Sequence, residues 1–199
     1  MKKIILAALL PTLLIFSIFI PAQKRDSDNK TEIQTVSSVD VKRFTGKWYE
    51  IARYPNKFQK KCVGNTTATY TRKADSKIEV INQCVLKDGI LGRAEGEASI
   101  ADTASNAKFE MRFASKYKSF LSTDWDNYWI VDLDENYQYA AASDPKGENL
   151  WILSRTPEMK DAIYQNILRR VERLGFNPGR LTKTPQNLEV IKGEIIQKQ

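Results

Sequence analysis

Between residues 44 and 155 the chain consists of short runs in which apolar and polar residues alternate, separated by turn residues. Alternation with a period of two is typical of strands that bury one face. The pattern predicts eight strands, at Phe44–Tyr54, Val63–Arg72, Lys77–Val85, Leu91–Ile100, Lys108–Phe113, Tyr128–Leu133, Tyr137–Ser143 and Glu148–Arg155. Their regular spacing and short turns favour an all-β fold, an eight-stranded up-and-down antiparallel β-barrel.

The first strand carries the residues around which the barrel is expected to close. Regular alternation gives it two faces, one with Tyr49, Ile51 and Arg53 and the other with Trp48, Glu50, Ala52 and Tyr54. Gly46 allows a sharp turn into the strand and leaves room beside Trp48. Arg155, at the end of the last strand, can lie over the Trp48 indole as a cation–π contact that closes one end of the barrel. An ordinary core tryptophan and a surface arginine are the alternative interpretation.

One helix is expected after the strands. Thr156 suits the N-cap and Pro157 the first helical position, and Gly175 suits the end. Five apolar residues between them fall on one helical face: Met159, Ile163, Ile167, Val171 and Leu174. We expect a helix over about Pro157 to Leu174 that packs outside the barrel and covers the Tyr128 strand, which is apolar on both faces. A membrane-surface helix is the alternative.

Two strands predict the character of the barrel interior. On the strand at 108–113 the charged residues face water, so the apolar residues face inward: Phe109, Met111 and Phe113. The preceding strand places small residues on one face: Ala94, Gly96 and Ala98. Small inward residues opposite large ones leave space inside a barrel, so we expect a cup.

The two ends of the chain differ from the middle. Residues 1–22 contain two lysines and then an apolar run, which indicates a cleavable export signal, with a retained N-terminal anchor as the alternative. No cysteine follows the run to accept a lipid. Residues 23–38 are polar and predict a tether. The barrel and helix take residues 39–186 and the tail takes 187–199, and residues 181–199 offer one possible short edge strand.

Composition removes several function classes. The chain has no histidine and two cysteines, so Ser-His-Asp and Cys-His nucleophiles and histidine-based zinc sites are excluded. We therefore predict no catalytic residue, no metal and no cofactor. The formal net charge is +7, but the basic residues are scattered without interleaved aromatics. This predicts no nucleic-acid partner and leaves room for peripheral contact with an anionic membrane.

Three segments in order resemble the lipocalin family: Gly46-x-Trp48, Asp126-Asn127-Tyr128 and Ser154-Arg155. The amino-acid sequence around these segments is most similar to the bacterial lipocalin and apolipoprotein D branch. The resemblance covers about Val39 to Gln186. It implies a cup-shaped barrel that binds a small lipophilic molecule without chemistry. Many Gram-negative relatives carry a lipid-acceptor cysteine after the signal, and this chain does not, which puts covalent outer-membrane anchoring in doubt.

The resemblance also implies which residues line the cup: Tyr70, Asn82, Phe113, Tyr128 and Trp151. The alternation pattern adds Phe109 and Met111 to this set. A few polar groups in an apolar cup would orient a carboxylate or a head group. Plain barrel core is the alternative role for each of these residues.

Cys62 and Cys84 fall on neighbouring antiparallel strands, and after export they are expected to form a disulfide. The alternative is a reduced thiol that serves as an enzyme nucleophile, as in the lipocalin branch that isomerises a prostanoid. The lack of a histidine to activate a thiol speaks against it.

The expected function is to carry or store a fatty acid or lysophospholipid in bacterial envelope lipid maintenance. A pigment or isoprenoid carrier and a lipocalin-fold thiol enzyme are the alternatives. We expect an exported monomer or homodimer, in the periplasm or associated with the outer membrane of a Gram-negative-type bacterium.

Overall fold

The computed structural model describes residues 33–75, 77–113, 126–191 and 194–197, which all belong to one compact unit, Thr31–Gln199. The predicted export signal and residues 114–125, between two of the predicted strands, lie outside the described residues. Within the described ranges, no helix is long and apolar enough to cross a bilayer.

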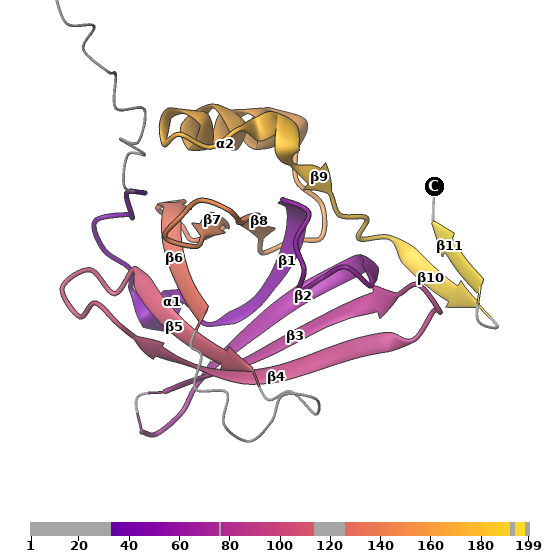
Figure 1. Cartoon of the computed structure of the whole chain (residues 1–199), viewed down its shortest axis with the longest axis horizontal. Coiled ribbons are helices and arrows are strands. Elements are labelled where there is room, and N and C mark those ends of the chain that lie inside the picture. The colour runs from indigo at the N-terminus through magenta and orange to yellow at the C-terminus, as the bar shows by residue number, and fades with distance from the viewer. Residues whose placement is uncertain (1–32, 76, 114–125, 192–193, 198–199) are drawn as a thin grey trace, which may run out of the picture. The chain divides into compact units, whose positions relative to one another are not determined.

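The eight predicted strands are present: β1 Gly46–Arg53, β2 Cys62–Arg72, β3 Ile78–Leu86, β4 Leu91–Ile100, β5 Lys108–Phe113, β6 Asp126–Leu133, β7 Tyr139–Ser143 and β8 Leu150–Ser154. From β2 to β8 each strand pairs antiparallel with the next, and β1 pairs with both β8 and β2 (Figure 1). These pairings close the sheet into the predicted up-and-down barrel.

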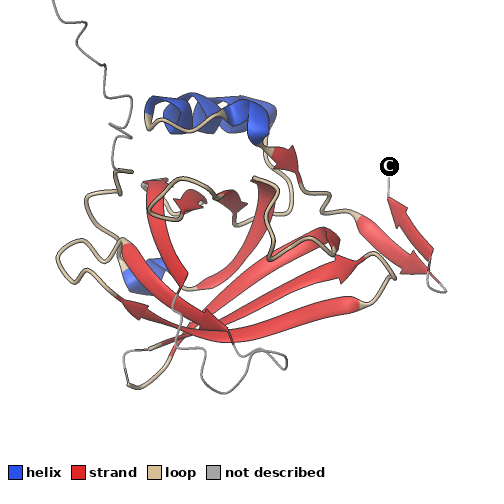
Figure 2. Ribbon diagram, viewed as in Figure 1, coloured by secondary structure: helices blue, strands red, loops and turns tan. Residues whose placement is uncertain are grey.

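The barrel has an inner and an outer apolar layer. Inside, Trp48, Val80 and Phe109 belong to one buried cluster. Outside, helix α2 (Asp161–Arg173) lies over β6, β7, β8 and β1 (Figure 2). Ile167 and Val171 of α2 are fully buried in a second cluster with residues of these strands. The predicted outer helix is therefore confirmed, and it covers the second apolar face of β6 as expected.

The predicted start of this helix was wrong. Residues 157–160 are not helical, and α2 begins at Asp161 after Lys160, which supplies no side-chain cap. The Thr156 hydroxyl donates to the Glu158 carbonyl oxygen at 2.7 Å instead of accepting from a helical amide. Because α2 begins five residues after Thr156, this hydroxyl is too far from the helix amides to serve as the N-cap. At the other end Gly175 has φ +91°, as expected of a residue that terminates a helix.

The predicted faces of the first strand were correct only as far as Ile51. The pairing of β1 with β8 runs Glu50↔Leu153 and then Ala52↔Ile152, so Ile51 is an extra residue, a β-bulge. The bulge shifts the alternation by one position. Ile51 and Ala52 therefore both join the outer cluster, and Arg53 forms an ion pair with Glu50.

Several short elements were not predicted as such. The lead into β1 contains a helical turn, α1 (Val41–Phe44), capped by the Asp40 carboxylate. Residues 33–38, expected to belong to the tether, contact the barrel, since Ile33 is buried and the Val36 amide donates to the Ile130 carbonyl.

After α2 come η1 (Pro178–Arg180), β9 (Thr182–Lys183) on the edge of β1, and a hairpin of β10 (Leu188–Ile191) and β11 (Glu194–Gln197).

Candidate ligand-binding site

One end of the barrel is closed by side chains. The guanidinium carbon of Arg155 lies 3.8 Å from the centroid of the Trp48 ring, so the predicted cation–π contact is confirmed. Arg155 also donates to the carbonyl oxygens of Lys47 at 3.0 Å and Tyr137 at 3.2 Å. The Trp48 indole donates to the Phe44 carbonyl oxygen at 2.8 Å. The Arg155 guanidinium and the Trp48 indole therefore link the backbone segments on both sides of the closed end.

Burial along the inner face decreases from this closed end toward the other. On β4, Ala98 is fully buried and Ala94 is exposed. On β3, Val80 is fully buried while Asn82 is partly buried, and on β5 burial likewise falls from Phe109 to Phe113. The half of the barrel next to the closed end, called the lower half, is thus packed core, and the inner-face residues Asn82, Ala94 and Phe113 of the other, upper half are partly or fully accessible.

The sequence-predicted site residues divide between these halves. Tyr70, Phe109 and Met111 belong to the buried inner cluster, and Phe113, Tyr128 and Trp151 pack against it while remaining partly accessible. Asn82 shares the β3 face of Val80, and its side chain has no hydrogen-bond partner among the described residues.

The predicted space along β4 is smaller than the small residues suggested. Ala98 has no exposed surface, and a Cβ atom added at Gly96 would lie 2.7 Å from the Phe113 ring. Both positions are therefore occupied by packing. Ala94, which pairs with Asn82, is the one of the three small residues that borders open space.

Two tyrosines form the polar part of the cup floor. The hydroxyl groups of Tyr70 and Tyr128 lie close enough to affect each other's pKa, and the Tyr128 ring lies 5.7 Å from the Trp151 ring between centroids. Burial raises the pKa of Tyr70 to about 12. Burial, and then the neighbouring Tyr70 and Glu50, raise the pKa of Tyr128 well above its ordinary value. Both phenols therefore stay neutral near pH 7 and can exchange hydrogen bonds with a ligand.

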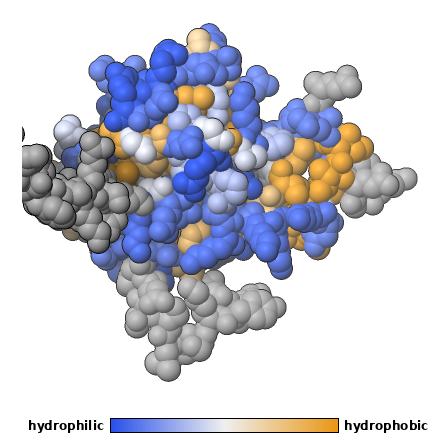
Figure 3. Space-filling model, turned by 45° about the horizontal axis from the view of Figure 1, so that its top comes forward, coloured by the Kyte–Doolittle hydropathy of each residue, from blue (hydrophilic) through white to orange (hydrophobic). Residues whose placement is uncertain are grey.

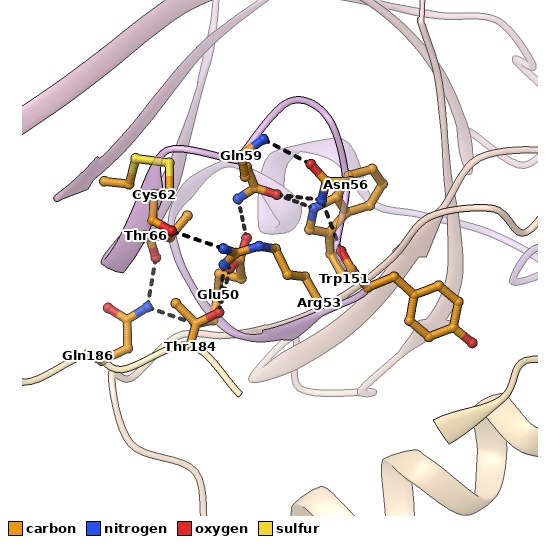
Figure 4. Close-up of polar contacts among 11 residues, drawn as sticks. Glu50, Arg53, Asn56, Gln59, Cys62, Thr66, Trp151, Thr184 and Gln186 are labelled. Carbon is orange, nitrogen blue, oxygen red and sulfur yellow. Dashed lines mark hydrogen bonds and ion pairs between the residues drawn. A yellow bond between two sulfur atoms is a disulfide. The ribbon is translucent and has the colours of Figure 1, made fainter. Parts of the chain in front are cut away.

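A buried ion pair, not predicted from the sequence, lies beside this floor (Figure 4). Glu50, 3% exposed, accepts hydrogen bonds from Arg53, Gln59 and Thr184. Arg53 also donates to the Thr184 hydroxyl at 3.0 Å and to the Cys62 carbonyl oxygen at 3.3 Å. Because regular alternation places Glu50 and Arg53 on opposite faces, only knowledge of the bulge could have revealed this pair.

The loop after β1 folds back onto the same cluster. Gln59 accepts from the Trp151 indole at 2.8 Å and donates to Glu50. Asn56 holds the loop in shape, because it accepts from the Gln59 amide and donates to the Gln59 side chain, both at 3.0 Å. The loop at residues 55–61 therefore supplies a polar wall to one side of the cup.

The C-terminal segment completes the barrel wall where β1 and β2 separate. The Gln186 side-chain nitrogen donates to the carbonyl oxygens of Glu50 at 2.7 Å and Thr66 at 2.9 Å, and so bridges the two strands. The Asn65 amide donates to the Pro185 carbonyl oxygen at 2.7 Å. The buried Thr66 hydroxyl has no hydrogen-bond partner among the described residues.

The two cysteines are joined, as predicted. Cys62 and Cys84 form a disulfide between β2 and β3, with 5.6 Å between Cα atoms. The chain has no other cysteine. In this oxidised protein no thiol remains for the nucleophile of the alternative enzyme hypothesis.

Comparisons with known proteins agree on one family. A family model described as "Lipocalin-like domain" matches residues 39–186. Temperature-induced lipocalin-1 of Arabidopsis thaliana is 36% identical over 160 residues, which are 79% of this chain and 85% of that protein. Outer membrane lipoprotein Blc of Escherichia coli K12 is 33% identical over 146 residues, which are 73% of this chain and 78% of that protein.

Solved structures share the fold at lower identity. Insecticyanin from the tobacco hornworm Manduca sexta superposes with a TM-score of 0.60 at 20% identity, over 76% of this chain and 83% of that one.

Proposed function

Because the chain belongs to the lipocalin family, we propose that it binds a lipid with a single acyl chain, a fatty acid or a lysophospholipid, in the upper half of its barrel. The observation that carries the proposal is the change along the inner face from packed core to accessible aromatic wall. A cup that is closed below and open above takes an elongated molecule by one end.

The wall of the cup suits an acyl chain. Phe113, Tyr128 and Trp151 present aromatic rings that remain partly accessible. Burying an acyl chain against them contributes roughly 0.8 kcal/mol for each CH₂ removed from water. The packed lower half limits how far an acyl chain can enter the barrel.

Polar groups are placed for a head group. Asn82 and the tyrosine pair offer hydrogen bonds inside the cup, and the exposed Lys57, Lys60 and Lys61 lie in the loop that bears Gln59. An ammonium group near the mouth attracts a carboxylate or a phosphate. Fatty acids and lysophospholipids share this combination of one chain and an anionic group.

The setting we propose is the bacterial envelope. The supports are the N-terminal pattern of residues 1–22 and the similarity to proteins named outer membrane lipoprotein in Escherichia coli and Vibrio cholerae. The chain would be exported and would act in envelope lipid maintenance, by carrying or storing its ligand and without catalysis. The pairing of its two cysteines supports a binding role.

The test is displacement of a fluorescent fatty acid, cis-parinaric acid, by palmitic acid and by lysophosphatidylcholine. Ala94→Phe fills the accessible part of the inner face, so it should weaken binding at least tenfold while the protein remains folded. Glu95→Phe is the matched control, because Glu95 alternates to the outer face and is exposed. If Ala94→Phe is folded and binds as tightly as the parent, the ligand does not occupy the cup.

A further inference from the structure

Exposed apolar side chains gather around the open end of the barrel. Among the described residues, six large apolar side chains are exposed. Five of them belong to segments at the open end: Phe58 at 54%, Ile90 at 61%, Leu91 at 59%, Val190 at 41% and Ile196 at 45%. Figure 3 shows the hydrophobic surface over the hairpin β10–β11. The sixth, Ile163, lies on α2.

The sheet register places the start of the hairpin β10–β11 at the same end of the barrel as Leu91. Gly64 pairs with Val85, and Val85 pairs with Leu91. Leu188, the first residue of β10, lies against Gly64 and exchanges hydrogen bonds with Asn65. The hairpin therefore begins at the same end of the barrel as Leu91.

The loop that carries Phe58 joins the same surface. The Lys87 amide donates to the Lys61 carbonyl oxygen at 3.2 Å, which ties loop 55–61 to loop 87–90. We call these two loops, Leu91 and the hairpin β10–β11 the open-end rim. Residues beyond 186 lie outside the family-model match, so the hairpin enlarges the rim beyond the matched domain.

The two loops of the rim also carry positive charge beside the apolar residues. The two loops carry four exposed lysines, Lys57, Lys60, Lys61 and Lys87, against one acidic residue, Asp88. Within the described residues none of these lysines forms an ion pair. Lysines beside exposed Phe, Ile and Leu are the combination that enters a lipid interface, with apolar ends among acyl chains and ammonium groups at phosphates.

We propose that the open-end rim docks on an anionic lipid bilayer, with Phe58, Ile90 and Leu91 inserted at the level of the head groups. A bilayer fits better than a second protein because the apolar side chains sit on three separate segments with lysines among them. The proposal does not depend on which molecule the cup binds. It places the mouth of the barrel against a membrane.

The experiment measures directly, in the full chain, how deeply the rim enters the lipid. Leu91→Trp places a fluorophore in the rim, and Ile163→Trp places one on α2 as the matched control. Both variants and the parent are mixed with vesicles of brominated phosphatidylcholine, with and without phosphatidylglycerol. Bromine quenches only tryptophans that reach the lipid. Since every protein carries the same N-terminal apolar run, differences between them report the added tryptophan.

We expect Leu91→Trp to be quenched at least twofold more than the parent and than Ile163→Trp, and more so with phosphatidylglycerol. Replacing the three loop lysines together by Lys57→Gln, Lys60→Gln and Lys61→Gln should remove the dependence on phosphatidylglycerol. Equal quenching in Leu91→Trp and Ile163→Trp overturns the proposal. A change in Leu91→Trp emission that depends on protein concentration without vesicles also overturns it, since a second copy would then cover the rim.

Discussion

The side-chain oxygen of Gln59 accepts a 2.8 Å hydrogen bond from the indole nitrogen of Trp151, across 92 positions in the chain. The same Gln59 donates to the buried Glu50. On this side of the barrel, side-chain hydrogen bonds therefore add to the pairing of β1 with β8, in which Trp151 lies opposite Arg53. A ligand that contacts Trp151 also meets this network, which makes Trp151 a natural fluorescence reporter of binding.

The Glu50–Arg53 pair should show strong coupling. Arg53→Met leaves the Glu50 carboxylate buried without its cation, so the free energy of unfolding should fall by about 3–5 kcal/mol. Glu50→Leu combined with Arg53→Met removes both charges and should cost less than the sum of the two single changes. Urea unfolding of all four proteins measures the coupling. Additive losses would show that the two charges are not energetically paired.

Arg155 should stabilise the closed end. Arg155→Ala removes the contact with Trp48 and the hydrogen bonds to four carbonyl oxygens, so we expect a loss of about 1–2 kcal/mol in the free energy of unfolding. Arg173→Ala on the exposed face of α2 is the control and should leave the midpoint nearly unchanged. An Arg155→Ala midpoint equal to that of the control would mean that the contact contributes nothing.

The disulfide should stabilise the barrel by restricting the unfolded chain. The bridge spans 22 positions, for which the chain-entropy estimate is about 3 kcal/mol. The double variant Cys62→Ala, Cys84→Ala should lose this amount in chemical unfolding, and reductant should no longer affect it. Titration of the unreduced parent should find no free thiol, and two titratable thiols would contradict the pairing.

Alkaline pH should destabilise the fold through Tyr70. In the unfolded chain a tyrosine loses its proton near pH 10, while burial holds the pKa of Tyr70 at about 12. Between these values only the folded state keeps the proton, so stability falls as the pH rises. Unfolding midpoints on either side of pH 10 should drop less in Tyr70→Phe than in the parent. Equal drops of the midpoint in the two proteins would show that groups other than Tyr70 cause the alkaline loss of stability.

The strands were predictable because their signal is local. In Lys108–Phe113 every second residue is charged, so the inward face could be read without any knowledge of the fold, and β5 has these same bounds. The contact between Arg155 and Trp48 was predictable because both residues occupy strand ends in a fixed topology.

The rest depends on information that is not local. The bulge at Ile51 exists because β1 pairs with β8 in a shifted register, and nothing in the Glu50–Arg53 sequence marks it. Gln59 and Gln186 are ordinary polar residues until the fold brings them to Glu50. The free space was overestimated at Gly96 and Ala98 because side-chain packing, which fills it with Phe113, has no signature in the alternation pattern.

The bridge formed by Gln186 has a consequence for biosynthesis. Residues 184–188 complete the wall between β1 and β2, although β1 is made more than a hundred positions earlier. A nascent chain that has not yet released this segment carries a slit beside Glu50, with the polar cluster open to water. The wall between β1 and β2 is therefore complete only after almost the whole polypeptide is available, and contacts of such long sequence separation form slowly.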